Sequence, residues 1–557
     1  MSGIPQTRQA ILSTLSPIHL GTDQDYTPTD YIIEDDVLYE FGSNALDNLP
    51  RPAREELDRI LAGPANTAML KRIQAFFYRQ REWLIPDAVN TVKVSPELAA
   101  LYRDRIGKAA QREGGGREVQ NRLEIERAAY HPVTRRLFFP GSGIKGAIRT
   151  ALLDQINDGQ TIPTALKKDR RANQIIQKEI FGGGFHTDPM RLFHTGDCHW
   201  CGPDALNSAE VLFAVNRKKK AVLKDGREVR SQAEQNNLDQ MLECCPSFRM
   251  RAFRGQFAIA DVDAIGKSRD LPELRFDFAD IAQACNRFYR PIWEREWRLL
   301  KSRGFLDAPW ADRVEKLMND PELQARMRRG EAFLLRVGRH SGAESVTLGG
   351  DGVRSIRIMK GKGQPPAYSD TTKTLWVGAE DRQDRRHLIP FGWVLVEWQH
   401  SDEALPPWET AEDLTRQTTG EMRSWLAQVQ SRKISLAQRQ NAARQAAETR
   451  AKEDAERRRE EEEKARRLAE MSEEERALES LREMFERDRK AGRKEAGGEL
   501  ANQINEWLKA ASDWPPAQKR ALADLAEAVY RYLGMLKGRR GRERKARIRA
   551  LTESAGQ

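Results

Sequence analysis

Residues 140–150, Pro-Gly-Ser-Gly-Ile-Lys-Gly-Ala-Ile-Arg-Thr, carry the most informative chemical groups of the chain. A short apolar strand runs into a Pro-Gly turn, and small residues then open a helix predicted over residues 144–156. The N–H groups of a first helical turn lack helical partners, and the helix dipole favours an anion there. Lys145 and Arg149 share one face of this helix, so both can reach the same phosphate backbone. The glycine-to-lysine spacing differs from that of a Walker loop, and an ordinary strand-to-helix turn is an equally good interpretation.

A second glycine-rich segment spans residues 337–352 and places Arg339 and His340 among many glycines. Glycine lets a sugar–phosphate chain approach the backbone closely, and a neighbouring arginine can neutralise a phosphate. The segment therefore predicts a contact with nucleic acid, with a long hairpin loop that binds nothing as the alternative.

Histidines and cysteines gather between residues 194 and 201. The spacing of Cys198 and Cys201 suits a tetrahedral zinc site. The other candidate pair, Cys244 and Cys245, is adjacent, and adjacent cysteines rarely bind one metal together. We therefore predict no metal and no cofactor, with buried or idle cysteines instead.

The composition bounds the class of protein. The chain has 557 residues, a net charge of +10 and a mean hydropathy of −0.71. A run of about 18 apolar residues, as a membrane span needs, does not occur, and the N-terminus lacks the pattern of a signal peptide. Five cysteines in this length do not make a disulfide framework, so we expect a cytoplasmic protein without a membrane partner. The positive charge indicates an anionic partner without identifying it.

The elements that must position these groups follow from apolar spacing. Strands alternate with helices up to about residue 402, with a helical pattern from about 50 to 130 and a strongly amphipathic helix over 276–300. Beyond that point residues 425–467 predict a solvated helix or a linker, and residues 478–551 predict a small helical bundle that ends in a basic helix. Strands are predicted at 18–21, 31–33, 37–41, 137–139, 210–215, 248–253, 333–337 and 393–398.

Four segments together resemble the RAMP superfamily of CRISPR-associated proteins. They are residues 16–21 (Ser-Pro-Ile-His-Leu-Gly), 140–150, 338–352 and 390–393 (Pro-Phe-Gly-Trp). Over about residues 10–400 the chain looks most like the fifth subunit of type III-A (Csm) effector complexes, which caps the crRNA 3′ end of the RAMP filament.

The resemblance implies an α+β fold made of tandem ferredoxin-like (RRM-like) RAMP domains with helical insertions and a mostly helical C-terminal extension. We expect an N-terminal RAMP domain over 1–268, with its helical insertion around 50–130. A C-terminal RAMP domain with the glycine-rich loop is expected over 269–402, followed by a charged helical extension and a small bundle over 403–557.

The resemblance also implies a hairpin "thumb" that inserts between guide nucleotides. Residues 216–230, rich in lysine and arginine, fit this element, and a solvated basic loop is the alternative. The residues expected to bind RNA lie in three groups. They are Ser142, Gly143, Lys145, Gly146 and Arg149; Arg217, Lys218 and Lys219; and Arg339, His340, Ser341 and Gly342.

The expected function is that of a non-catalytic crRNA-binding subunit of a type III CRISPR ribonucleoprotein. Such a subunit holds the guide backbone, caps the crRNA 3′ end, and contributes to crRNA maturation and antiviral defence. Its expected partners are crRNA, other RAMP backbone subunits and target RNA, and no catalytic residue is predicted.

Two alternatives stay open. One is a RAMP endoribonuclease that processes crRNA with His19 or His340 as general acid or base. Asp23, Asp25 and Asp36 lie where the cleaving subunits carry an aspartate, although an acid in a polar loop is usually only a loop residue. The other alternative is a helical scaffold that acts through the C-terminal tail.

Overall fold

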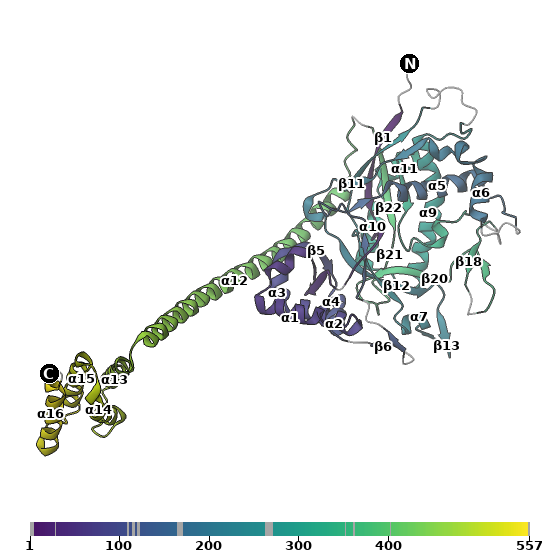
Figure 1. The fold of residues 1–557 in the computed structure, drawn as a ribbon. Helices are drawn as coiled ribbons and strands as arrows, with labels where there is room; N and C mark the ends of the chain where they lie inside the picture. The colour runs from purple at the N-terminus through teal and green to yellow at the C-terminus, as the bar shows by residue number, and fades with distance from the viewer. Residues whose placement is uncertain are drawn as a thin grey trace. The chain divides into compact units, whose positions relative to one another are not determined.

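The computed structural model describes residues 5–27, 29–108, 111–113, 117–119, 123–163, 171–261, 271–350, 353–359, 363–400 and 403–554. The chain divides into two compact units, residues 1–440 and residues 441–557 (Figure 1). The positions 351–352 of the glycine-rich segment lie outside the described residues.

One sheet of the first unit has the order of a ferredoxin-like fold. The central strand β1 lies between β16 and β22 and is antiparallel to both, with Ala10 opposite Gly255 and Trp398. The helices α5 and α9 follow β9 and β16 in the chain and pack against each other (Figure 1). The sheet order is β17 (Ala332–Arg336), β22 (Trp393–Gln399), β1 (Gln6–Thr14), β16 (Phe253–Ile259), β11 (Cys198–Trp200) and β9 (Phe138–Phe139), with β10 (Phe193–Thr195) also on β16.

Helix α9 (Phe278–Ser302) supplies much of the core on this sheet. It starts at a capping box in which Asp277 and Asp280 each accept a hydrogen bond from the other's backbone N–H. Its Trp293 packs edge-on against Trp393 of β22, with 4.9 Å between ring centroids. The predicted amphipathic helix is therefore confirmed, and its indole side chain joins helix to sheet.

A second sheet holds the remaining long strands of the first unit. The strand β12 at its centre pairs with β15 and β20 in antiparallel and with β5 in parallel orientation. The other members continue on either side. Bounds are β2 (Gly21–Tyr26), β8 (Ile125–Ala128), β15 (Asp239–Cys244), β12 (Glu210–Lys218), β5 (Ala88–Val94), β4 (Val37–Phe41), β3 (Tyr31–Glu34), β20 (Thr374–Ala379) and β21 (Ile389–Pro390).

Three local expectations differ from the structure. At 18–21 a strand is absent up to Gly21, where β2 begins, and Ile18 forms only an isolated bridge to Cys245. The region 50–130 contains α1 (Arg51–Leu61), α2 (Thr67–Arg79), α3 (Arg81–Leu84) and α4 (Pro96–Arg105), but also β5 and β8 of the second sheet. Residues 248–252 form turns instead of the predicted strand. There Phe248 and Arg251 take positive φ angles of 61° and 48°, and Ser13 Oγ accepts the Arg251 N–H at 2.7 Å. A side-chain oxygen thus replaces a strand partner.

The helical C-terminal region predicted from composition is confirmed. The helix α12 (Glu409–Glu470) places Leu414, Trp425 and Leu436 in the core of the first unit. Its Trp425 Nε1 donates to Asp36 at 2.9 Å, which anchors it beside the β3–β4 turn. The first compact unit reaches residue 440, and strands from both sides of residue 268 share its first sheet. The domain boundaries at 268 and 402 stay predictions.

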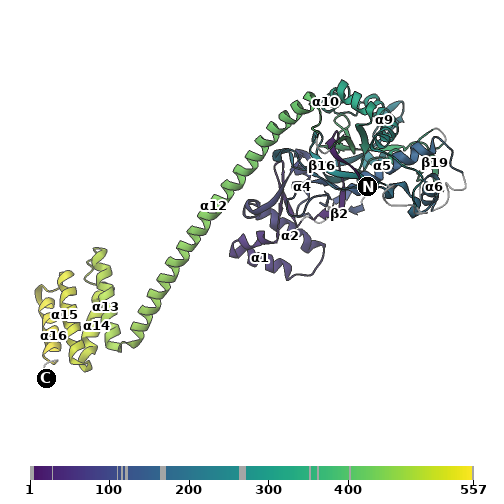
Figure 2. The same cartoon turned by 90° about the horizontal axis from the view of Figure 1, so that it is seen from above.

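The second unit has a core of its own. Side chains such as Leu481, Ile504, Leu522 and Val529 bury together, as their spacing predicts. The helices α13 (Glu473–Lys490), α14 (Glu499–Ala510), α15 (Pro516–Tyr532) and α16 (Gly538–Glu553) pack side by side (Figure 2). Across the described part of the chain, every helix is too short or too polar to cross a membrane.

Candidate nucleic-acid interface

The segments that carry the resemblance meet at the end of the first strand. The Arg339 N–H donates to the His19 carbonyl at 2.9 Å, so the glycine-rich loop is hydrogen-bonded to residues 16–21. The Gly392 N–H donates to the Pro17 carbonyl at 3.0 Å, and the Trp393 N–H donates to Ser16 Oγ at 2.8 Å. Segments more than 300 residues apart in sequence therefore form one backbone junction.

Glycine is required at this junction. Gly338 has a φ of 81°, and a side chain there would collide with the His19 carbonyl. The start of helix α5 (Gly141–Asn157) reaches the same place, because Leu20 Cδ2 lies 3.5 Å from where a Cβ would stand on Gly143. The same carbon lies 3.6 Å from the corresponding position on Gly338. Leu20 is thus the apolar contact between the helix start and the loop.

At the start of α5 the cationic side chains have protein partners. Lys145 Nζ donates to the Phe193 carbonyl at 2.6 Å, and burial lowers the pKa of Lys145. Arg149 forms an ion pair of 2.7 Å with Asp188. The first N–H group of the helix, that of Gly141, donates to Asp197 Oδ1 at 2.7 Å. Groups that the sequence marks for phosphate therefore already hold the fold together.

What the helix start leaves open to solvent is a small, uncharged face. Ser142 and Gly146 are exposed, and a Cβ on Gly146 would meet nothing within 4 Å. A backbone of another molecule can approach such a face closely.

The glycine-rich loop holds its histidine tightly. The His340 ring stacks on Trp376 of β20, with 4.7 Å between centroids and 18° between planes. Its Nε2 lies 2.8 Å from Gln240 Oε1. Burial, with the Arg339 charge nearby, lowers the pKa of His340 to about 4, so the ring is neutral near pH 7. Arg339 forms an ion pair of 2.5 Å with Glu126.

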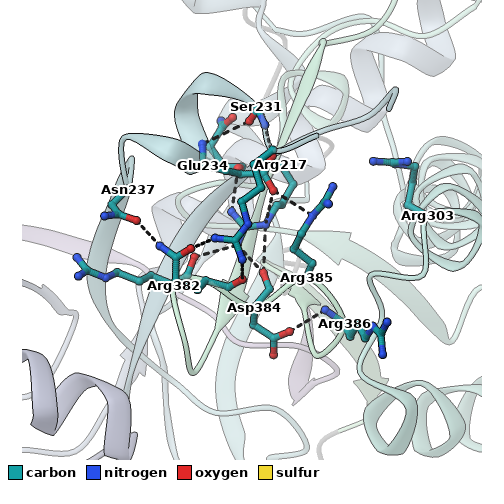
Figure 3. A network of polar contacts seen from close by, with 12 residues as sticks. Arg217, Ser231, Glu234, Asn237, Arg303, Arg382, Asp384, Arg385 and Arg386 are labelled. Carbon is teal, nitrogen blue, oxygen red and sulfur yellow. Dashed lines mark hydrogen bonds and ion pairs between the residues drawn. The ribbon is translucent and has the colours of Figure 1, made fainter. Parts of the chain in front are cut away.

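The basic segment 216–230 contains a β-hairpin. Strands β13 (Val222–Lys224) and β14 (Arg227–Val229) pair, and the turn residues Asp225 and Gly226 both have positive φ. At its base Arg217 is buried and donates to the carbonyls of Arg382 at 3.0 Å and Asp384 at 3.2 Å (Figure 3). The expected RNA contact Arg217 therefore has its guanidinium inside the protein.

Lys219 joins the hairpin base to the glycine-rich loop. Its Nζ lies 2.5 Å from Glu344 Oε1 and 3.0 Å from Thr371 Oγ1. Burial by itself would raise the pKa of Glu344. The Lys219 charge and hydrogen bonds from backbone N–H groups outweigh burial and lower this pKa to about 2. The ion pair therefore persists over the whole physiological pH range.

A cavity of about 1130 Å³ lies between these two elements. Five of the residues expected to bind RNA line it, whereas those of α5 do not. The five that line the cavity are Lys218, Lys219, His340, Ser341 and Gly342. The lining also includes Trp376, Arg295 and Arg354, which the sequence gave no reason to choose. The alternation Thr-Leu-Trp-Val-Gly-Ala of β20 is the one signal from which a strand carrying Trp376 could have been predicted.

Several candidates for acid–base catalysis and for metal binding are buried or hydrogen-bonded within the protein. His19 is 1% exposed, and its Nδ1 donates to the Glu243 carbonyl at 2.7 Å, while burial lowers its pKa. Asp36 accepts the Trp425 indole N–H. Within the described residues no group of three or more His, Cys, Asp or Glu side chains could hold a metal ion. Cys198 is buried, which raises its pKa.

The comparison with known protein families gives one match. Residues 11–228 match the model of the RAMP superfamily. This region runs from β1 to the β13–β14 hairpin and includes residues 16–21 and 140–150, so the match confirms the resemblance that these segments carry. No curated protein matches the chain.

Solved structures to which the chain shows some similarity include the following two. One is a chain of the cryo-EM structure of a Csm–crRNA–target RNA ternary complex, with 15% identity and a TM-score of 0.42, covering 70% of this chain and 100% of that chain. The other is the crystal structure of T. onnurineus Csm5, with 16% identity and a TM-score of 0.38, covering 70% of this chain and 99% of that chain.

Proposed function

We propose that this chain is a non-catalytic crRNA-binding subunit of a type III CRISPR effector complex. It holds the guide backbone, caps the crRNA 3′ end of the RAMP filament, and so contributes to crRNA maturation and antiviral defence. The observation that carries the proposal is the cationic cavity where the hairpin base and the glycine-rich loop meet, in a chain whose first part matches the model of the RAMP superfamily.

RNA is held in this proposal by charge and by backbone approach. Lys218 and Lys220 at the hairpin base neutralise phosphates, and the exposed face of Ser142 and Gly146 receives the sugar–phosphate chain. Affinity then falls steeply as salt rises, because bound counterions are released. Base sequence has little influence, since phosphate contacts position a strand without specifying its bases. The other proposed partners are RAMP backbone subunits and target RNA.

Co-purification tests the assignment. The full chain is expressed with its neighbouring operon genes and a CRISPR array, and the nucleic acid and proteins that purify with it are identified. Short RNAs of repeat-plus-spacer origin in a large assembly are the expected result. A chain that purifies alone and without RNA contradicts the proposal.

An endoribonuclease is the competing function, and the placement of His19 argues against it. A general acid or base must reach the reacting group, and His19 is buried against Glu243. His340 is held between Trp376 and Gln240. We expect wild type and His340→Ala to leave labelled repeat RNA uncut to the same extent. Cleavage by the wild type that the substitution abolishes would establish the competing function.

A scaffold role of the tail is tested by truncation after residue 440, where the first compact unit ends. A cut at 402 would remove Leu414, Trp425 and Leu436 from the core of that unit and confuse unfolding with loss of function. We expect residues 1–440 to keep guide RNA. Loss of both RNA and protein partners on this truncation would favour the scaffold.

A further inference from the structure

The cavity between the hairpin base and the glycine-rich loop is larger than RNA backbone contact needs. Its volume of about 1130 Å³ exceeds the upper range, about 1,000 Å³, of pockets that enclose drug-sized ligands. Helix α9 forms one wall through Ile292, Arg295 and Leu299. A whole nucleotide, with room for its neighbours' phosphates, fits in such a space.

The charge of the lining is strongly positive. Seven lysine and arginine side chains face three acidic ones among the described lining residues. Two of the acids are already used, because Glu296 pairs with Arg336 at 2.8 Å and Glu344 pairs with Lys219 at 2.5 Å. The remaining cations, Arg354 among them, leave a field that attracts an anion.

Arg354 is a buried cation of the lining with a hydrogen-bond donor unsatisfied within the described part of the chain. Its side chain is 8% exposed, and its Nε has no hydrogen-bond partner among the described residues. Burial and the nearby Arg295 charge lower its pKa, and the carboxylates of Glu344, Asp154 and Asp370 oppose this shift only in part, so its charged form is held at a cost. A phosphate oxygen would accept from this guanidinium and offset that cost.

The cavity also offers an aromatic surface. Trp376 is only half buried, and its ring is held in place by the stacked His340 ring and by strand pairing of Trp376 with Asn216. His340 is neutral near pH 7, so the pair does not repel the cations around it. Unstacked bases of single-stranded RNA stack on flat aromatic side chains such as this indole, while neighbouring cations bind the phosphates.

We propose that this cavity holds one nucleotide turned out of the bound RNA strand, with its base against the Trp376–His340 pair and its phosphate on Arg354. The neighbouring phosphates lie on Lys218 and Lys220. This inference rests on the proposed function, because the nucleotide belongs to the RNA that the subunit holds.

The test measures binding of fluorescein-labelled 12-nucleotide single-stranded RNAs to the full chain. A set in which each position in turn lacks its base locates the nucleotide. One such RNA should bind wild type about tenfold more weakly, as expected for a lost stacking contact. Trp376→Ala should lose about tenfold on intact RNA and nothing further on that abasic RNA. Trp376→Phe, which keeps an aromatic ring, should retain most of the affinity.

Two further variants make the result specific. Arg354→Gln should weaken binding of intact and abasic RNA alike, because it removes a phosphate contact. Phe185→Ala, at an aromatic side chain 75% exposed and outside the cavity lining, is the matched control and should bind as wild type does. Equal affinity of wild type and Trp376→Ala for intact RNA overturns this inference and leaves the proposed function standing.

A free nucleotide is the other source of the same chemistry. The four nucleoside monophosphates at 1 mM should fail to displace the labelled RNA, and displacement would assign the cavity to free nucleotides instead. A wild-type chain that binds none of the RNAs would overturn the proposed function together with this inference. The two failures are therefore distinguishable.

Discussion

The start of α5 and the wall of the cavity differ in what their cations do. Both regions join glycines to lysine and arginine. At α5, Lys145 donates to a backbone carbonyl and Arg149 is paired with Asp188. In the cavity, Arg354 keeps a buried Nε without a partner among the described residues. Positive charge in a motif therefore indicates a ligand only where the fold has not already neutralised it.

The difference has a topological cause. Helix α5 lies within the ferredoxin-like layer, where β10 and the following loop bring carbonyls and carboxylates to its first turns. The strand β12 pairs with β20 as far as Lys218, and the chain then continues into the β13–β14 hairpin, with Lys218 and Lys220 in the lining of the cavity. Arg217 and Lys219 nevertheless have protein partners, because Arg217 points back into the protein at the hairpin base (Figure 3) and Lys219 pairs with Glu344.

The largest expected effect is on stability, at Arg217. Arg217→Ala removes the donor to two loop carbonyls and leaves the buried Glu234, 3.7 Å away, without this cation. The free energy of unfolding should fall by about 3 kcal/mol, as for other broken buried pairs. Urea denaturation measures it, and Lys218→Ala, one residue on, is the matched control with little expected change. Equal stability of the two variants would show that the network at the hairpin base contributes nothing.

The next prediction compares the RNA affinity of variants in the cavity wall with that of variants at the start of α5. Lys218→Ala with Lys220→Ala should weaken single-stranded RNA binding roughly tenfold and reduce the salt slope by about 1.4, for two lost phosphate contacts. Its melting temperature should stay close to that of wild type, since both side chains lie at the surface of the cavity wall.

The matched variant is Lys145→Ala with Arg149→Ala. From the sequence alone it should lose RNA without unfolding. Because the structure ties both side chains to protein acceptors, we expect a loss of about 1–2 kcal/mol of stability and a smaller loss of affinity than in the cavity variant. A tenfold loss of RNA affinity at unchanged stability would reverse the comparison and place the main phosphate contacts at α5.

A further expected effect is a pH dependence confined to the cavity. The folded chain protonates His340 only near pH 4, whereas the unfolded chain does so near its ordinary pKa of about 6.5. Between these values the unfolded state binds more protons, so stability falls as the pH falls. His340→Gln removes this contribution. The melting temperature falls between pH 7 and pH 4.5, and this fall should be about 2–4 °C smaller in His340→Gln than in wild type. An unchanged pH difference would mean that His340 is protonated in the fold.

Part of this molecule follows from its sequence alone. The capped, amphipathic α9, the Asp-Gly turn of the hairpin and the helical bundle at the C-terminus are local patterns, and the structure contains each of them. The RAMP resemblance rests likewise on short segments such as residues 16–21. Local periodicity and turn chemistry depend on neighbours in the chain, so a single sequence carries them.

The tertiary structure alone decided which charges are free. Arg217, Lys218 and Lys219 are consecutive, yet one is buried in a network, one lines the cavity and one pairs with Glu344. The partners of Arg217 and Lys219 named above lie 17 to 167 residues away in the chain. Trp376 and Arg354, which line the same cavity, are likewise distant from them in sequence. An ion pair or a stacking surface forms by proximity in space, and proximity between distant segments is set by the packing of the two sheets. The sequence therefore determined the local elements, and the fold determined which of the cationic side chains have protein partners.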